Sequence, residues 1–184
     1  TADAGYGSEE NYQWLEDKRI TAYIKYNQFD RMQNESIRNK SAFTVDQLTY
    51  DEHRNQFYCP IGEPMKHIGW TVEPTRSGYP QIKDSYQAQN CNGCFLNGTC
   101  NQQQGNRVIE TSINNRRLRQ KAEKRLKSKR GIQKRKQRCF DTEPVFANIK
   151  QNHNFRRFLL RGKEKVAVET GLLALAHNLR KKSA

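Results

Sequence analysis

Long apolar runs and a hydrophobic leader are absent from this sequence. Hydrophobic residues make up 34% of its 184 residues, and the mean hydropathy is −1.06. No stretch approaches the roughly 18 apolar residues that a membrane-spanning helix needs, and no secretion signal opens the chain. The chain begins at Thr1 rather than at a methionine, which points to a fragment. We therefore expect a soluble, cytoplasmic polypeptide without a membrane partner, built around a modest core.

Cysteine is scarce, and its number is odd. The five cysteines are Cys59, Cys91, Cys94, Cys100 and Cys139. An odd count without a secretion signal argues against a secreted domain held together by disulfides. Cys139 lies close to Glu143 in the sequence, and we expect it to be a core residue.

Acids are nearly missing from one segment. The net charge of the chain is +14, and residues 116–138 hold thirteen Lys or Arg and one acid, Glu123, for a net charge of +12. Charge of that density attracts polyanions and gains affinity by releasing counterions from a phosphate backbone. Few bulky apolar side chains accompany it, which disfavours insertion into a membrane surface. We expect the segment to contact nucleic acid; a solvated helix face is the alternative.

The opening of the chain has the pattern of a strand–helix–strand unit. Residues 1–6 resemble the end of a strand, and Ser8 is a suitable N-cap for the helix that follows. Tyr12 and Leu15 are spaced to face a core from that helix. Residues 20–26 alternate apolar and polar side chains, as a half-buried strand does. Because such units build parallel sheets, we predict an α/β fold.

The remaining chain changes character twice. Residues 51–110 hold short apolar stretches between Pro and Gly residues, which indicates a small β-rich insertion carrying four of the five cysteines. Residues 111–184 have helical periodicity. We therefore divide the chain into residues 1–50, residues 51–110 and residues 111–184.

Three helices are predicted in the last part. In the basic helix, Leu118, Ala122 and Leu126 recur every four residues and form a narrow apolar stripe. We expect the next helix to bury Val145, Phe146 and Ile149. The most apolar stretch of the chain, residues 163–179, is expected to be a core helix.

Two segments carry a resemblance to a known family. The first is the run of residues 2–11. The second begins with Glu143-Pro144-Val145-Phe146, continues through residues 155–162 and closes with residues 171–179. These segments resemble the signature blocks of DDE-type transposases of bacterial insertion sequences, and the similarity covers essentially the whole chain. The cysteines between the two blocks are similar to the cysteine-rich insertion of one branch of these enzymes.

The resemblance implies an RNase H-like fold in which two aspartates and one glutamate hold divalent metal, Mg²⁺ or Mn²⁺. It places the second aspartate at Asp3 and the glutamate at Glu143. The first aspartate of relatives lies upstream of Asp3, so we expect a partial fold with its first strands missing and a polypeptide that is inactive alone. The implied partners are transposon ends and target DNA, with a homodimer in the transposition complex, at the bacterial nucleoid.

The chemistry of transposition explains why carboxylates are needed. Cleavage and strand transfer are in-line displacements at DNA phosphodiesters, assisted by two divalent cations that prefer oxygen ligands. Asp3 follows a strand, where the ligands of open α/β sheets gather, and Glu143 begins a helix. Lys150 follows seven residues later, which in an α-helix misses two full turns by only about 20°. Lys150 is therefore expected on the same helix face as Glu143, in contact with bound DNA.

Further cations are candidates for phosphate contacts. The resemblance implies an arginine shortly before the glutamate, and Arg138 is its match. Arg156, Arg157 and Arg161 are the other candidates. Phosphate contacts position DNA without reading its sequence. For Arg156 and Arg157 the alternative is pairing with acids in a core.

A structural zinc site is predicted in the β-rich insertion. Four of the cysteines offer thiolates for tetrahedral zinc: Cys59, Cys91, Cys94 and Cys100. Such a site would stabilise a small segment that has little core. Either His53 or His67 could replace the first of these ligands, and unligated thiols are the alternative.

The sequence leaves two alternatives to an active transposase. One is a non-enzymatic DNA-binding module that uses the basic helix and is indifferent to Asp3 and Glu143. The other is a decayed transposase relic with no selected function.

Overall fold

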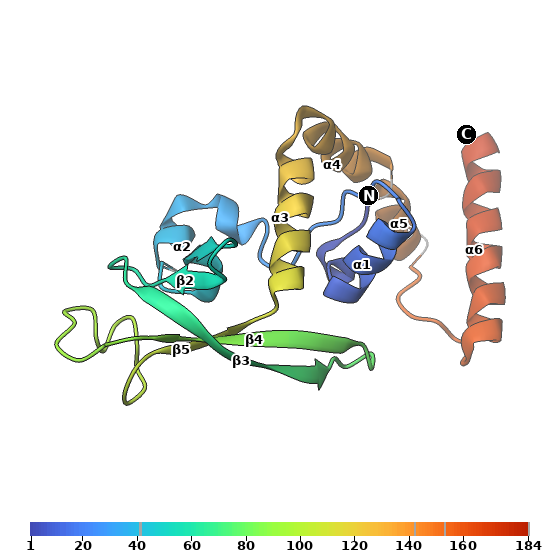
Figure 1. The fold of residues 1–184 in the computed structure, drawn as a ribbon. Helices are drawn as coiled ribbons and strands as arrows, with labels where there is room; N and C mark the ends of the chain where they lie inside the picture. Colours follow the sequence, from blue (N-terminus) through green and yellow to red (C-terminus); the bar gives the residue numbers. More distant parts are fainter. Residues whose placement is uncertain (41, 142, 153, 184) are drawn as a thin grey trace. The chain divides into compact units, whose positions relative to one another are not determined.

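The computed structural model describes residues 1–40, 42–141, 143–152 and 154–183, and only the backbone of Glu143. The chain divides into two units, Thr1–Gly131 and Ile132–Ala184. The elements in chain order (Figure 1) are η1 (Ala4–Tyr6), α1 (Glu9–Asp17), η2 (Arg31–Gln33), α2 (Glu35–Lys40), η3 (Val45–Gln47), β1 (Thr49–Asp51), β2 (Gln56–Tyr58), β3 (Pro64–Pro74), β4 (Pro80–Ala88), β5 (Val108–Thr111), α3 (Ile113–Lys127), α4 (Lys129–Asp141), α5 (Glu143–Ala147), the π-helix η4 (Asn148–Asn152) and α6 (Lys163–Ser183).

One five-stranded sheet lies in the first unit. Its strands have the order β1-β2-β3-β4-β5, and every neighbouring pair is antiparallel. The longest pair is the β3–β4 hairpin, in which Trp70 lies opposite Asp84, and a register shift falls between His67 and Gly69. The chain is therefore a mixed α/β protein, as predicted, although its sheet is antiparallel.

The predicted parallel sheet is reduced to a single contact. Ala2 and Ile24, which precede and follow α1 in the sequence, form an isolated parallel bridge. The backbone N–H of Ala2 donates to the Tyr23 carbonyl at 3.2 Å. Among the described residues, Ala2 is the one that forms a β-bridge with residues 20–26. The alternation in residues 20–26 therefore gives an extended segment that buries Ile24 and Tyr26, and not a longer strand.

α3 packs in the first unit through the apolar stripe that the sequence predicts. Leu118, Ala122 and Leu126 are buried, because a spacing of four residues returns to one face of a helix. Figure 1 shows α1 and α3 on the same side of the sheet. The same cluster includes four more buried side chains: Tyr12, Ile24, Tyr26 and Phe29.

A second apolar cluster lies on the sheet, and Arg116 ties α3 to it. The buried members of this cluster are Leu48, Phe57, Met65, Tyr86, Ala88 and Ile109. The Arg116 guanidinium lies 5.2 Å from the centre of the Phe57 ring and donates to the carbonyls of Val45 at 3.0 Å and Leu48 at 2.6 Å. Burial lowers the pKa of Arg116, because desolvation disfavours its charge. Arg116 thus joins two elements and does not have the phosphate-binding position expected of the basic segment.

The second unit corrects three predictions about burial. No described residue of α6 is buried, and Leu172, Leu175 and Leu179 are 56–62% exposed. Phe146 is also exposed, and so is Cys139, which was expected in a core. Apolar periodicity defines the face of a helix but not the surface that covers it. Among the described helices, α6 included, none is long and apolar enough to span a membrane.

Candidate functional site

Asp3 lies directly after the Ala2–Ile24 bridge. Its Oδ1 accepts a hydrogen bond from the backbone N–H of Ala4 at 3.0 Å and so caps the short helix η1. The residue is exposed to solvent. Asp3 therefore has the local position that the sequence predicts, an accessible carboxylate at the end of a strand-like segment.

Gly7 lets the Asp3 segment pass closely against the residues that follow the bridge. A Cβ at this position would lie 2.3 Å from the Lys25 carbonyl oxygen and 2.8 Å from the Cα of Tyr26. A Cβ at Gly5, by contrast, would meet no atom within 4 Å. Gly7 was not singled out from the sequence, where the only signal is a glycine between the strand and the Ser8 cap.

Glu9 connects this segment to the rest of the first unit. The residue is 5% exposed, and its carboxylate accepts hydrogen bonds from Gln81 Nε2 at 2.6 Å, Ser112 Oγ at 2.9 Å and Asn114 Nδ2 at 2.9 Å. These donors belong to β4 and to the start of α3. Sequence reasoning missed Glu9, because an acid in the first turn of a helix is normally explained by the helix dipole and not by burial.

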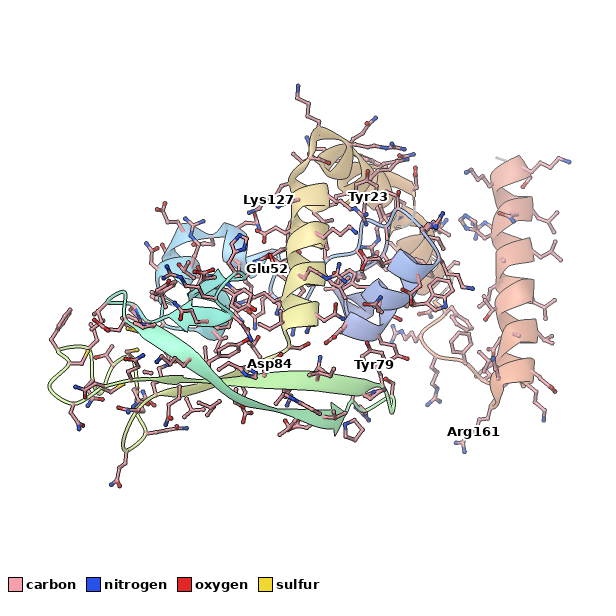
Figure 2. The ribbon with its side chains drawn as sticks, in the orientation of Figure 1. Tyr23, Glu52, Tyr79, Asp84, Lys127 and Arg161 are labelled. Atoms are coloured by element: carbon pink, nitrogen blue, oxygen red, sulfur yellow. The ribbon has the colours of Figure 1, made fainter. Side chains whose placement is uncertain are left out.

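The tip of the β3–β4 hairpin also contacts α1. Glu10 accepts a hydrogen bond from Ser77 Oγ at 2.6 Å. Tyr79, which Figure 2 labels on the same hairpin, has its pKa raised by desolvation and by the carboxylates of Glu9 and Glu10. The start of α1 is thus held by the hairpin as well as by α3.

Glu143 begins α5, where the sequence places the start of a helix. Its side chain lies outside the described residues. Asp3 belongs to the first unit and Glu143 to the second. The convergence of the two carboxylates on one metal ion therefore stays a prediction.

The helix that follows Glu143 changes type before it reaches Lys150. α5 ends at Ala147, and the next five residues form the π-helix η4, in which Lys150 is exposed. A π turn closes hydrogen bonds from residue i to i+5, so seven residues no longer complete two turns. The prediction of a shared face assumed continuous α-helical geometry, which the structure does not have. Single π turns often lie at functional sites, which keeps Lys150 a candidate.

The arginines ahead of α6 are all on the surface. Arg156, Arg157 and Arg161 are exposed, and Arg161 is labelled in Figure 2. Arg156 Nε donates to Asn154 Oδ1 at 3.2 Å. Exposure rules out the alternative in which Arg156 and Arg157 pair with acids in a core. Arg138, in the last turn of α4, is half-buried.

The first half of the basic segment is bound to acids of its own unit. Glu16 of α1 accepts hydrogen bonds from Arg117 at 2.7 Å and from Lys121. Arg119 lies 3.3 Å from Asp46. These ion pairs stabilise the packing of α3 in the first unit. The paired cations of α3 therefore have a structural role and are not a set of free side chains that await phosphate.

We expect the first unit to lose stability in acid as Glu16 is protonated. Hydrogen bonds from Arg117 and Lys121 lower the pKa of Glu16 from 4.5 to about 2. A carboxyl whose pKa is depressed by folding adds stability above its unfolded pKa, and this stability is lost as the pH falls from 4.5 to about 2. Because the pairs lie at the surface, the contribution is about 1 kcal/mol.

Urea unfolding across this pH window tests the expectation, with tryptophan fluorescence as the probe. Trp14 and Trp70 are the two tryptophans of the chain, and both lie in the first unit. Glu16→Gln should remove the acid-dependent part of the unfolding free energy. A variant whose pH dependence superimposes on that of the parent chain would contradict the assignment.

The predicted zinc ligands do not share one centre. The four cysteines concerned are half-buried: Cys59, Cys91, Cys94 and Cys100. Arg107 connects two of them, since its backbone N–H donates to Cys91 Sγ at 3.4 Å and its Nη1 to Cys100 Sγ at 2.9 Å. His67 Nε2 lies 3.1 Å from Asp84 Oδ1. Across the described side chains, no three of Cys, His, Asp and Glu gather as metal ligands, and zinc binding stays a prediction.

Comparison with known protein families shows what the chain is similar to. The family described as "Transposase DDE domain" matches residues 58–182, which is more than half of the chain. The chain belongs to this family, and the resemblance to DDE-type transposases is confirmed. The family comprises transposase-type enzymes that act on DNA, generally with divalent metal ions. The match includes Glu143 and Lys150, while Asp3 lies ahead of it. No curated protein and no solved structure matches the chain.

Proposed function

We propose that this chain serves in the metal-dependent cleavage and strand transfer of DNA phosphodiesters during transposition, as part of an RNase H-like fold. The observation that carries the proposal is the family match over residues 58–182, with Glu143 at the start of a helix inside it. The exposed carboxylate of Asp3, at the end of a strand-like segment, supports it from outside the matched residues.

Asp3 and Glu143 would hold the divalent cation, Mg²⁺ or Mn²⁺. Carboxylate oxygens are the ligands that such hard cations prefer, and Asp3 is accessible to one. When bound, the cations activate the attacking oxygen and stabilise the leaving oxygen. The protein's own residues would hold the carboxylates in place and would position the DNA strand next to them. Since the 184 residues carry matches to two of the three acids of the family, we expect weak metal binding and no cleavage by this polypeptide alone.

The DNA strand would be held by cations of the helices around Glu143. The candidates in the second unit are Lys150, Arg138, Arg156, Arg157 and Arg161. Lys129 and Arg130, in the first turn of α4, are exposed and extend this set to the end of the first unit. Contacts of these side chains to phosphate would fix the position of the strand and not its sequence.

The cations of α3 and α4 are expected to contribute unequally to DNA binding. Replacing Lys129 and Arg130 by alanine should lower the affinity for duplex DNA about tenfold and reduce the slope of log K against log salt concentration by about 2. The matched control replaces Arg117 and Lys121, one arginine and one lysine that are bound to Glu16. Fluorescence anisotropy over a range of salt concentrations measures the affinity and the slope for each of the two variants. Equal changes of slope in the two variants would contradict the division of roles.

A nicking assay tests the proposed chemistry. Because the polypeptide is expected to be inactive alone, it should show no robust nicking of supercoiled DNA; any residual nicking should require Mg²⁺ or Mn²⁺ and should be abolished by Asp3→Asn and by Glu143→Gln. Glu164→Gln is the control, because Glu164 lies in the first turn of α6 as Glu143 does in α5. Nicking that survives both substitutions would contradict the assignment of the site. DNA binding without any effect of these acids would favour the non-enzymatic DNA-binding module.

A further inference from the structure

A cavity of about 430 Å³ opens in the first unit between α3 and the segment of residues 26–47. Four cations, two acids, three glutamines and a threonine are among the residues that line it. The volume is in the range of sites that hold small molecules. Asp3 does not line this cavity, and the proposed cleavage chemistry leaves it unexplained.

At the cavity, Arg38 and Lys127 each form an ion pair with an acid of the same helix. Arg38 Nη2 lies 4.0 Å from Glu35 Oε1, and the two side chains are 49% and 79% exposed. Lys127, labelled in Figure 2 in the last turn of α3, lies 2.5 Å from Glu123 and is 53% exposed. Exposed pairs of this kind contribute little to stability. An anion can therefore replace the carboxylate partners at small cost.

A planar cationic group forms part of the wall. The Arg119 guanidinium lies 4.7 Å from the centre of the Tyr26 ring and lines the cavity with it. Planar guanidinium groups stack on aromatic rings. An occupant with a flat ring suits this group.

The polar side chains in between can bind the edge of such a ring. Gln47 and Gln120 each present an amide with two N–H donors and one carbonyl acceptor. Thr44 adds a hydroxyl that donates and accepts. The lining as a whole has an excess of two positive charges. It is complementary to a ligand that combines an anion with a flat, hydrogen-bonding ring.

We propose that this cavity binds a nucleoside phosphate, with the phosphate at Arg38 and Lys127 and the base against Arg119. A nucleotide of a single DNA strand and a free mononucleotide share this chemistry. Binding here requires neither metal nor the carboxylates of the proposed catalytic site. Its failure in an experiment is therefore distinct from a failure of the proposed cleavage function.

The two methionines of the chain provide a direct readout. Met32 lines the cavity, whereas Met65 is fully buried in the cluster on the sheet. Nuclear magnetic resonance of ¹³C-methyl-methionine protein, titrated without metal, follows both methyl groups. The probes are deoxynucleoside 5′-monophosphates, inorganic phosphate and a single-stranded oligothymidylate. We expect the nucleotide probes to shift the Met32 signal saturably and to leave Met65 in place, with inorganic phosphate binding at least about tenfold more weakly, because it lacks the stacking ring.

Arg38→Ala should raise the Kd for the nucleotide about tenfold, which is the loss of one charge-assisted hydrogen bond. The control is Arg54→Ala, since Arg54 is also exposed and lies 3.9 Å from an acid three residues away, but does not line the cavity. Tighter binding of the oligothymidylate assigns the ligand to a DNA strand, and tighter binding of the monophosphate assigns it to a free nucleotide. The proposal is overturned if Met32 does not respond to either nucleotide probe. It is also overturned if inorganic phosphate binds equally well, or if the two arginine variants behave alike.

Discussion

Replacing Glu9 by alanine is expected to lower the free energy of unfolding of the first unit by about 3 kcal/mol. Glu9 is 5% exposed, and its carboxylate is the common acceptor for donors on Gln81, Ser112 and Asn114. Removing it leaves these donors without their acceptor at a site that water reaches poorly. Because the three donors come from β4 and the start of α3, the loss also weakens the attachment of α1 to both. Contacts of Glu10 with the hairpin and of Glu16 with α3 remain.

Glu10 provides the matched control, because it is the next residue of the same helix turn. Its side chain accepts a hydrogen bond from Ser77 Oγ at 2.6 Å, and the residue is exposed. Glu10→Ala should therefore change the unfolding free energy by less than about 1 kcal/mol. Urea unfolding followed by the fluorescence of Trp14 and Trp70 measures both variants. Similar losses at the two positions would mean that Glu9 does not connect the elements of this unit.

Gly7→Ala is expected to have an effect of similar size, about 3 kcal/mol. A methyl group here would lie 2.3 Å from the Lys25 carbonyl oxygen and 2.8 Å from Tyr26 Cα, which are backbone atoms and cannot turn aside. The Asp3 segment must then move away from the residues after the Ala2–Ile24 bridge. We expect binding of Mn²⁺ to weaken together with stability, since Asp3 shifts with this segment.

Gly5→Ala separates this steric effect from a general effect of losing a glycine. A Cβ at Gly5 meets nothing within 4 Å, and its backbone does not have the positive φ that favours glycine. The Gly5 variant should fold and bind Mn²⁺ as the parent chain does. Thermal unfolding and Mn²⁺ titration of the two variants give the comparison. A Gly7 variant as stable as the Gly5 variant would show that the close approach does not constrain the Asp3 segment.

Local patterns in the sequence predicted those parts of the fold that depend on neighbours in the chain. The stripe of Leu118, Ala122 and Leu126 is buried as its spacing requires. Ser8 caps α1 through a hydrogen bond from the N–H of Asn11. In both cases the same few residues make the pattern and the contact. β3 and β4 lie within residues 51–110, which were expected to be rich in strands because apolar stretches between turn residues are local features.

Features that depend on distant partners could not be predicted in this way. Arg116 lies in a run of cations, and only the position of the sheet turns it towards the carbonyls of Val45 and Leu48. The donors of Glu9 lie 72 to 105 residues away in sequence. The leucines of α6 show the converse, since their spacing predicts a buried face, whereas Leu172, Leu175 and Leu179 are exposed.

In the candidate catalytic site, too, the features that depend on local sequence were predictable and those that depend on distant residues were not. The position of Asp3 after a strand-like segment, and of Glu143 at the start of α5, follow from local pattern and from the resemblance. The face shared by Glu143 and Lys150 was derived from regular helix geometry, and the π-helix after Ala147 interrupts it. Spacing arguments hold only as long as the helix type is constant. The catalytic role of Asp3 and of Glu143 requires that the two carboxylates lie close together in space, and a local sequence pattern cannot predict this.

A double-mutant cycle on Mn²⁺ affinity tests most directly whether Asp3 and Glu143 hold the same metal ion. Asp3→Asn, Glu143→Gln and the double variant are titrated with Mn²⁺ by electron paramagnetic resonance, with Glu164→Gln as control. If both carboxylates hold one ion, each single substitution weakens binding at least about tenfold, and the second adds clearly less than it does alone. Independent, additive effects, or no effect of either substitution, would contradict a shared metal site and with it the proposed transposase chemistry of this chain.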